Sequence, residues 1–340
     1  MQDKNVLEVR NLNVAFQTSA GMLPVVRDVS FEVARGETLA LVGESGSGKS
    51  VTSLGILRLT PPAPGCSLTG EVWLRDRDGG QRNLLTLTDH QMRDVRGRDA
   101  AMVFQEPMTS FNPLHTIGRQ IAEGVRWHEG VNEKVGRDRA TELLDLVGIP
   151  DARARLDAYP HHLSGGMRQR AMIAMALSCN PSLLIADEPT TALDVTIQAQ
   201  ILELLQRLQQ RNGMSMVFIT HNLGVVAEIA DRVVVMYGGR IVEQADVVPL
   251  FKAPRMPYTM GLLDSVPRLD HAGKRRGALR AIPGNVPDPY DPPPGCSFAP
   301  RCAHAVPAIC NTAVPALSEL PDRHLVRCAR WQDVPAREEA

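Results

Sequence analysis

Eight consecutive residues form a glycine-rich loop whose spacing suits the binding of phosphate groups. They fit the pattern G-x-x-x-x-G-K-[ST] in full and read Gly43-Glu44-Ser45-Gly46-Ser47-Gly48-Lys49-Ser50. In such a loop, backbone N–H groups surround the phosphates, Lys49 neutralises the β- and γ-phosphates, and the Ser50 hydroxyl ligates Mg²⁺. A chance glycine-rich turn is the alternative. The strand predicted over 38–42 and the helix predicted over 51–59 supply the context that a phosphate loop requires, so we expect a nucleotide site here.

A second cluster of small residues, Ser164, Gly165 and Gly166, precedes a stretch that is rich in alanine and methionine and favours a helix over 168–177. Small residues let the backbone approach an anion closely, and a helix N-terminus favours negative charge. Two anion-binding turns in one chain suggest a nucleotide that is held between two surfaces.

Two acids, Asp187 and Glu188, end the apolar strand predicted over 183–186. Asp187 can hold Mg²⁺, and Glu188 is then placed to polarise an attacking water as a general base. The alternative is a solvated pair of acids at a strand end. The phosphate loop upstream favours the catalytic interpretation.

Three further polar residues are weaker candidates. Gln105 and His221 each follow a predicted strand, so the amide of Gln105 can order water or bind Mg²⁺, and the imidazole of His221 can hydrogen-bond a γ-phosphate. Asp194 can cap the helix predicted over 195–211. Taken singly, each of these residues also fits a purely structural role.

Cysteines gather in the proline-rich C-terminal part of the chain. Four of the six occur there, as Cys296-x5-Cys302-x7-Cys310-x17-Cys328, and we expect no functional role for the isolated Cys66 and Cys179. In a cytosolic chain the four are not expected to form disulfides, and thiolates favour zinc or an iron–sulfur cluster. The short C-x2–4-C pair typical of zinc sites is absent, so the spacing favours a cluster; unliganded buried cysteines are the alternative.

These candidates must be positioned by strands that alternate with helices, a pattern that indicates a mainly parallel sheet in an α/β fold. From 113 to about 176, apolar residues recur three and four apart and predict a helical insert. After about Pro254 the composition changes, and we expect the following tail to be a separate element without a large apolar core. The predicted strands are 7–16 (as an edge strand), 25–33, 38–42, 70–74, 100–104, 183–186, 215–220 and 232–237.

Bulk composition excludes several classes of protein. A net charge of −1 and an aromatic content of 4% give no general basic field and few stacking platforms, so we expect no nucleic-acid partner. No apolar run reaches the ~18–20 residues of a transmembrane helix. The first residues, 1–5, do not begin a signal peptide, and we expect a cytosolic protein.

The motifs resemble, in kind and order, those of the ATP-binding cassette of ABC transporters, over about residues 5–250. The resemblance identifies the phosphate loop as Walker A, 183–188 as Walker B, and 163–169 as the signature, with Met167 at the usual Gln position. It implies roles for single residues at the Q-loop, the D-loop, the switch histidine and the aromatic that contacts adenine: Gln105, Asp194, His221 and Phe16.

The tail is similar to the C-terminal extension of the oligopeptide/dipeptide importer ATPases, on the residues 281–287 and 295–302. The resemblance implies that the four cysteines can hold a [4Fe–4S] cluster. The segment 159–161 before the signature also fits this family, whereas His162 stands where the family commonly has Glu.

The resemblance implies a P-loop NTPase fold of the ABC ATPase type: a mainly parallel sheet, an antiparallel β subdomain, a helical insert and a small cysteine-containing extension. We expect an ABC ATPase domain over 1–254, with its helical subdomain at about 106–176, and the extension over 255–340.

It also implies an ATPase subunit that uses Mg²⁺ and powers the import of di- and oligopeptides at the cytoplasmic face of a bacterial inner membrane. The expected partners are a second homologous ATPase, two transmembrane permease subunits and an extracytoplasmic substrate-binding protein. Nickel or glutathione import is the nearer alternative, and a non-transport ABC ATPase the more distant one.

Overall fold

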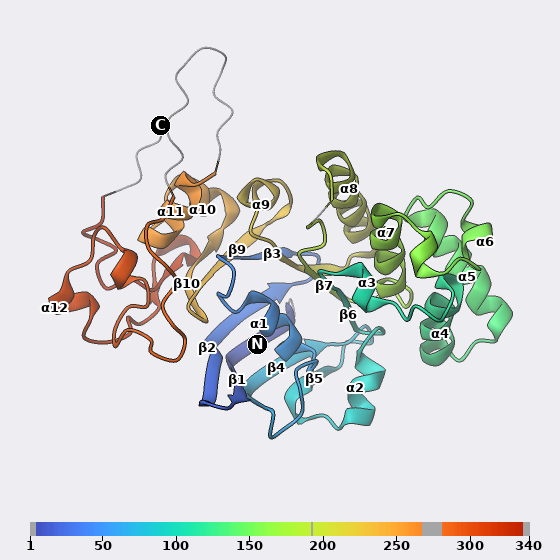
Figure 1. Ribbon diagram of the computed structural model, residues 1–340, viewed down its shortest axis with the longest axis horizontal. Helices are drawn as coiled ribbons and strands as arrows, with labels where there is room; N and C mark the ends of the chain where they lie inside the picture. The colour runs from blue at the N-terminus through green and yellow to red at the C-terminus, as the bar shows by residue number, and fades with distance from the viewer. Residues whose placement is uncertain (1–4, 192, 267–280, 336–340) are drawn as a thin grey trace, which may run out of the picture.

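The computed structural model describes residues 5–191, 193–266 and 281–335. Among these residues the larger sheet has the strand order β11-β12-β10-β9-β3-β8-β7-β6, in which β9, β3, β8, β7 and β6 run parallel and the others antiparallel (Figure 1). The predicted mainly parallel sheet is therefore confirmed. Its strands are β3 (Thr38–Val42), β6 (Ala100–Val103), β7 (Leu183–Asp187), β8 (Ser215–Ile219), β9 (Arg232–Tyr237), β10 (Arg240–Asp246), β11 (Ser318–Glu319) and β12 (Leu325–Val326).

A smaller antiparallel sheet has the order β2-β1-β4-β5, with β1 (Asn5–Thr18), β2 (Gly21–Ala34), β4 (Cys66–Arg75) and β5 (Gln81–Asn83). Strand β1 lies between β2 and β4, so the prediction of an edge strand at 7–16 is wrong. Its buried residues Leu7, Val9, Leu12 and Val14 are separated by more exposed ones. That alternation indicates a sheet with one solvated face. It does not indicate whether the strand has a partner on one side or on both.

The described helices are α1 (Lys49–Ile56), α2 (Asp89–Val95), α3 (Pro107–Ser110), α4 (Ile117–Glu129), α5 (Glu133–Leu146), α6 (Ala152–Arg155), α7 (Gly165–Ala176), α8 (Val195–Asn212), α9 (Leu223–Ile229), α10 (Val247–Lys252), α11 (Pro257–Asp264) and α12 (Pro307–Cys310). Single 3₁₀ turns are η1 (Leu84–Thr86), η2 (Pro160–His162), η3 (Ala299–Arg301) and η4 (Pro321–Arg323). Among the described residues, none of the helices combines the length and the apolar character that a membrane span needs.

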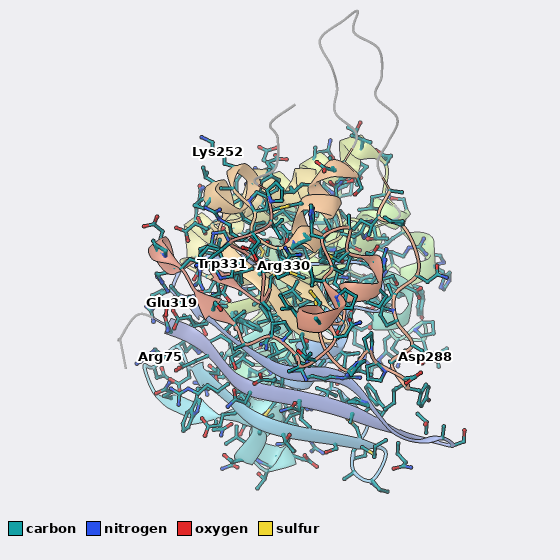
Figure 2. The ribbon with its side chains drawn as sticks, turned by 90° about the vertical axis from the view of Figure 1, so that its left-hand side faces the viewer. Arg75, Lys252, Asp288, Glu319, Arg330 and Trp331 are labelled. Carbon is teal, nitrogen blue, oxygen red and sulfur yellow. The ribbon has the colours of Figure 1, made fainter. Side chains whose placement is uncertain are left out.

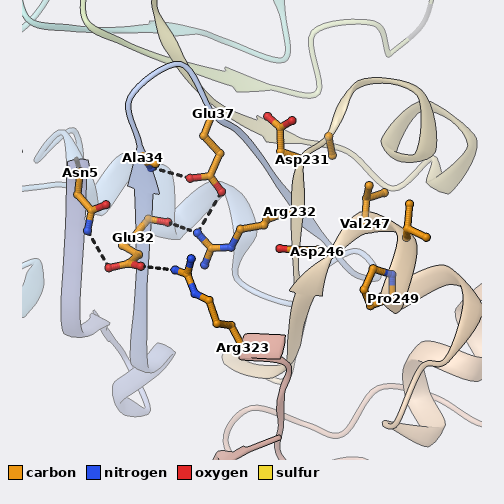
Figure 3. Close-up of a pocket in the computed structure, with 12 residues that line it drawn as sticks. Asn5, Glu32, Ala34, Glu37, Asp231, Arg232, Asp246, Val247, Pro249 and Arg323 are labelled. Carbon is orange, nitrogen blue, oxygen red and sulfur yellow. Dashed lines mark hydrogen bonds and ion pairs between the residues drawn. The ribbon is translucent and has the colours of Figure 1, made fainter. Parts of the chain in front are cut away.

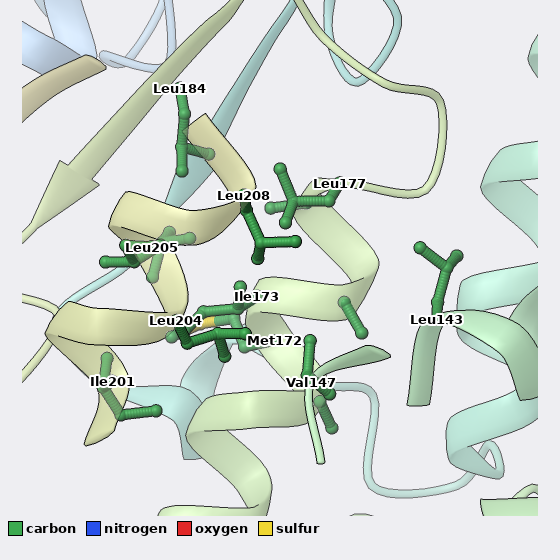
Figure 4. Close-up of a cluster of buried hydrophobic side chains, with 14 of the residues drawn as sticks. Leu143, Val147, Met172, Ile173, Leu177, Leu184, Ile201, Leu204, Leu205 and Leu208 are labelled. Atoms are coloured by element: carbon green, nitrogen blue, oxygen red, sulfur yellow. The ribbon is translucent and has the colours of Figure 1, made fainter. Parts of the chain in front are cut away.

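The helical insert is built from α3 to α7, in the predicted part of the chain. Figure 4 shows its apolar contact with α8, where Ile173 of α7 lies beside Leu204 of α8, both at most 2% exposed. Helix α1 packs on the small sheet, so closely that a Cβ on Gly55 would lie 3.1 Å from Val14 Cγ2. Helix α1 is thus held against the small sheet and α7 against α8, so the two helices lie in different parts of the molecule (Figure 1).

The tail does not stand apart as the expected separate element. Strand β12 pairs with β10 through Gln244 and Leu325 and so lengthens the larger sheet, while Phe298 and Val326 are buried in its apolar cluster. The division at 254/255 remains a prediction. Figure 2 views this side, with Trp331 toward the viewer and Asp288 on the side of the β1–β2 turn.

Candidate functional site

The phosphate loop joins the end of β3 to the start of α1, as the sequence predicts. Gly43 has a φ of 149°, and a Cβ there would lie 2.2 Å from the backbone oxygen of Met236. Gly48 has a φ of 100°, a left-handed conformation that disfavours other residues. These two positions require glycine, because a side chain at Gly43 would overlap β9 and the backbone of Gly48 is left-handed.

Lys49 is the buried cation of the loop, at 5% exposure. Its Nζ donates hydrogen bonds to the backbone oxygens of Gly43, at 2.8 Å, and Glu44, at 3.0 Å. Burial lowers the pKa of Lys49, and the carboxylates of Glu188 and Asp187 oppose that effect. The ammonium therefore lies inside the loop, where the phosphates of a nucleotide would meet it.

Ser50 and Asp187 lie together at the start of α1 and the end of β7. The Ser50 hydroxyl donates a hydrogen bond to Asp187 Oδ1 at 3.0 Å. Burial raises the pKa of Asp187, while the Ser50 hydrogen bond lowers it and the charge of Glu188 raises it further. A hydroxyl and a carboxylate are the hard oxygen donors that Mg²⁺ prefers, so this pair fits the ion.

Glu188 brings three of the predicted candidates together. Its carboxylate accepts hydrogen bonds from Thr191 Oγ1, at 2.8 Å, and Gln105 Nε2, at 3.4 Å, and lies 3.3 Å from His221 Nδ1. The residue has a φ of 44°, and its N–H donates to the backbone oxygen of Ile219. This strained backbone turns the carboxylate away from the strand and toward Gln105 and His221.

The signature turn (Ser164–Gly166) lies apart from the phosphate loop, at the start of α7 (Figure 1). The Ser164 hydroxyl accepts a hydrogen bond from the N–H of Met167, and Ser164 and Gly165 are exposed. Asp194 caps α8 by accepting from the N–H of Ile197 at 3.0 Å and is exposed as well. Within one chain, therefore, these residues are open to another molecule. Their contact with nucleotide remains a prediction.

Phe16 is half-buried near the end of β1, opposite Leu23 on β2 and Cys66 on β4. Its side chain packs against the apolar cluster of the small sheet. The structure thus leaves part of the ring accessible, and the expected contact with adenine remains a prediction.

The four tail cysteines line one cavity of about 20 Å³, next to Phe298 and Ala299. Burial raises the pKa of Cys296 and Cys302, and it raises the pKa of Cys328 to about 11. Within the described ranges, however, no group of three or more His, Cys, Asp or Glu side chains is arranged so that it could hold a metal ion. The thiols share a cavity but do not form a ready ligand set.

Two side chains outside the predicted set form hydrogen bonds with Glu44 of the loop. Tyr258 Oη accepts a hydrogen bond from the N–H of Glu44, and the guanidinium of Arg301 binds the Glu44 carboxylate. The sequence marked Arg301 only by its place beside Cys302. Glu44 fills a variable position of the phosphate-loop pattern, which gives no hint of a side-chain partner.

A wider pocket of about 570 Å³ lies between β2, β9 and α10 (Figure 3). Two ion pairs lie in its lining, Arg232 with Glu37 at 3.0 Å and Arg323 of the tail with Glu32 at 2.7 Å. The residues that line it include none of the predicted site residues. It is therefore separate from the nucleotide site.

Two family models match the chain. The model described as "ABC transporter" matches residues 26–191, which include the phosphate loop, the signature turn and Glu188. The model described as "Oligopeptide/dipeptide transporter, C-terminal region" matches residues 242–310, which include Cys296, Cys302 and Cys310.

Relatives match along almost the whole chain. A putative peptide import ATP-binding protein of Brucella melitensis is 57% identical over 339 residues, which are 99% of this chain and 100% of that protein. The dipeptide transport ATP-binding protein DppD of Bacillus subtilis is 49% identical over 325 residues, 96% of this chain and 94% of that protein. The oligopeptide transport ATP-binding protein OppD of the same organism is 50% identical over 322 residues, 95% of this chain and 88% of that protein.

Among solved structures, the chain is similar to an ATP-binding cassette described as a dimer in a post-hydrolysis state, bound to ADP and Pi. The TM-score is 0.62 at 26% identity, over 71% of this chain and 98% of the other. The protein cbiO1 of Clostridium perfringens, described as part of an ABC transporter complex, gives a TM-score of 0.57 at 26% identity, over 73% of this chain and 91% of the other.

Proposed function

The chain belongs to the ABC transporter family of ATPases, and from that premise we propose that it powers the import of di- and oligopeptides. The assignment of peptides as the cargo rests on the similarity of nearly the whole chain to proteins named for peptide, dipeptide and oligopeptide transport. The match of the C-terminal region to oligopeptide/dipeptide transporters supports the same assignment.

We propose a separate role in ATP hydrolysis for each residue of the site. The loop N–H groups and Lys49 bind the phosphates, and Ser50, Asp187 and Gln105 would hold Mg²⁺, which neutralises phosphate charge when bound. Glu188 accepts a proton from the attacking water, and the Gln105 amide and the His221 imidazole beside it orient that carboxylate. His221 Nδ1 lies 3.3 Å from the Glu188 carboxylate, and in this proposal the imidazole also hydrogen-bonds the γ-phosphate.

The exposed signature turn supports a site that is shared between two ATPase subunits. In this proposal Ser164, Gly165 and Asp194 of one subunit close on a nucleotide held by the phosphate loop of the other. A similar solved cassette is described as a dimer bound to ADP and Pi, which agrees with such an arrangement. The second subunit is a homologous ATPase.

The remaining partners follow from peptide import. Two transmembrane permease subunits would carry the peptide, an extracytoplasmic binding protein would deliver it, and this chain would lie at the cytoplasmic face of the inner membrane. The cargo is tested by uptake of radiolabelled dipeptide, oligopeptide, nickel and glutathione in cells with and without the gene. We expect loss of peptide uptake alone. Loss of nickel or glutathione uptake, with peptide uptake intact, would contradict the proposed cargo.

Replacing Lys49 with alanine should weaken Mg-ATP binding about 10- to 150-fold, because a charged hydrogen-bond donor to the phosphates contributes roughly 1.5–3 kcal/mol. Isothermal titration of the full chain measures this effect. Lys134→Ala, at an exposed lysine of α5, is the matched control and should bind as the wild type does. Unchanged Mg-ATP binding by Lys49→Ala would show that the loop is not the nucleotide site.

We also propose that Cys296, Cys302, Cys310 and Cys328 hold one metal centre, a [4Fe–4S] cluster in preference to zinc. Thiolates favour both centres and the four thiols line one cavity, but they are not arranged as a ligand set in the structure, so binding must draw the sulfur atoms together. Anaerobic purification with iron, sulfide and zinc analysis is expected to give four irons and four sulfides per chain. Cys302→Ala should lose them, and Cys66→Ala, in β4, should keep them. Stoichiometric zinc without sulfide would refute the cluster, and no metal would refute both centres.

A further inference from the structure

We propose that Arg301 is a positioning residue that holds the phosphate loop in its nucleotide-binding conformation through Glu44, so that the tail sets the affinity of the loop for ATP. The inference deepens the proposed nucleotide site and rests on it. Arg301 lies 257 residues along the sequence from Glu44, in a part of the chain that contributes no residue to the predicted phosphate contacts.

The guanidinium of Arg301 is completely hydrogen-bonded. NH1 donates to Glu44 Oε2 at 2.6 Å and to Tyr237 Oη at 3.3 Å, and NH2 donates to Glu44 Oε1 at 3.0 Å. NH2 also donates to the backbone oxygen of Ile282 at 3.3 Å, and Nε donates to that of Pro283 at 2.9 Å. Five acceptors therefore match the five N–H groups of the side chain, which fixes its position and orientation.

The contact on Glu44 is a two-pronged ion pair in a sheltered place. The Arg301 side chain is 4% exposed and that of Glu44 is 28% exposed. Parallel N–H···O bonds of this kind add geometric specificity to charge attraction, and a lysine cannot reproduce the fork. The pair thus determines where the Glu44 side chain lies, and with it the second residue of the phosphate loop.

Glu44 is held from three directions at once. Its carboxylate binds Arg301, its N–H donates to Tyr258 Oη at 2.8 Å, and its backbone oxygen accepts from Lys49 Nζ at 3.0 Å. Lys49 is the phosphate-binding cation, so a shift of Glu44 moves an acceptor of that ammonium. The tail and α11 are in this way connected to the charge that meets the nucleotide.

A packed aromatic cluster supports the arginine. The ring centroids of Tyr237 and Tyr258 are 4.6 Å apart, and each lies 5.3 Å from that of Phe298. Arg301 Cζ is 5.8 Å from the Tyr237 ring and 6.0 Å from the Phe298 ring, which favours a cation over these faces. Arg301 is therefore seated on rigid groups of β9, α11 and the tail.

The arginine is also tied to the cysteine segment by the backbone. Its N–H donates to the backbone oxygen of Phe298 at 3.0 Å, and the N–H of Cys302 donates to that of Ala299 at 3.2 Å. Cys296 and Cys302 enclose this turn, η3. A change in the shape of the turn would accordingly change the position of the guanidinium.

The test measures Mg-ATP affinity of the full chain by isothermal titration, with thermal melting as the check on folding. Arg301→Gln and Glu44→Ala are each expected to raise the Kd about tenfold, in the ordinary range of coupling between sites. Glu44→Ala removes a negative charge near the phosphates, so a purely electrostatic role predicts tighter binding instead. Arg301→Lys keeps the charge without the fork and should be as weak as Arg301→Gln.

Arg323→Gln is the matched control. Arg323 is also a tail arginine in an ion pair, but its partner is Glu32 of the small sheet and not a residue of the phosphate loop (Figure 3). It is expected to bind ATP as the wild type does. Wild-type affinity in Arg301→Gln, or full rescue by Arg301→Lys, or tighter binding by Glu44→Ala, would overturn the positioning role. If Arg301→Gln fails to fold, Glu44→Ala decides, since it leaves the tail sequence intact.

The same measurement separates this inference from the nucleotide site on which it rests. Normal affinity in both Glu44→Ala and Arg301→Gln, beside lost affinity in Lys49→Ala, would refute the positioning role alone. Normal affinity in Lys49→Ala would refute the nucleotide site itself.

Discussion

Replacing Glu188 with glutamine is expected to lower ATP turnover by about 10²–10⁴-fold while Mg-ATP still binds, because the change removes a general base and keeps the size of the side chain. The structure gives this carboxylate the surroundings that the role needs. It is 14% exposed, faces His221 Nδ1, and accepts hydrogen bonds from the Gln105 amide and the Thr191 hydroxyl. The rate is measured as phosphate release by the assembled transporter.

Glu203→Gln is the matched control for that experiment, since Glu203 is an exposed acid on α8. It should hydrolyse ATP as the wild type does. Turnover by Glu188→Gln within a few-fold of the wild type, with binding intact, would show that another group accepts the proton.

Replacing Ser164 with arginine is expected to abolish peptide uptake without changing ATP binding to the chain itself. Ser164 is exposed at the start of α7, away from the phosphate loop of its own chain (Figure 1). An arginine there places bulk on the surface that would close on the partner subunit's nucleotide. The transition-state charge would then lack donors from that surface.

Uptake of labelled peptide by the reconstituted complex and ATP binding by the variant subunit together decide this prediction. Ser19→Arg, in the exposed turn between β1 and β2, is the matched control and should transport normally. Peptide uptake that survives Ser164→Arg would show that the signature turn does not close on nucleotide.

Much of the fold could be predicted because the chemistry-bearing residues stand at the ends of short apolar strands. The strand before Gly43, the strand before Glu188 and the strand before His221 are all buried parallel strands, and their carboxyl ends meet at one edge of the sheet. Their side chains therefore converge without any long-range information beyond the order of the strands. The contacts of Glu188 with Gln105 and His221 agree with that reasoning.

Pairing between distant segments could not be predicted in the same way. The alternation in β1 reports one buried face and cannot show that β2 and β4 flank it. Strand β12 is only two residues long, too short for a periodic signal, and its pairing with β10 places the tail on the sheet. The ion pair between Arg301 and Glu44 depends on that docking, so no local pattern could reveal it.

The spacing of the tail cysteines predicts their proximity but not the centre that they would bind. Their spacing predicts a shared site, and the structure does place Cys296, Cys302, Cys310 and Cys328 around one cavity. Whether these thiols hold the proposed centre depends on small differences in sulfur positions, which the spacing does not encode.

In the proposed function, ATP hydrolysis by this chain drives peptides across a membrane. It is tested most directly by measuring ATP hydrolysis and labelled-peptide accumulation together, in vesicles that contain the permease, the partner ATPase and this chain. We expect accumulation only with hydrolysable ATP on the side of this chain, and loss of both activities with Glu188→Gln. Accumulation at the wild-type rate with a non-hydrolysable ATP analogue would show that hydrolysis by this chain does not drive transport.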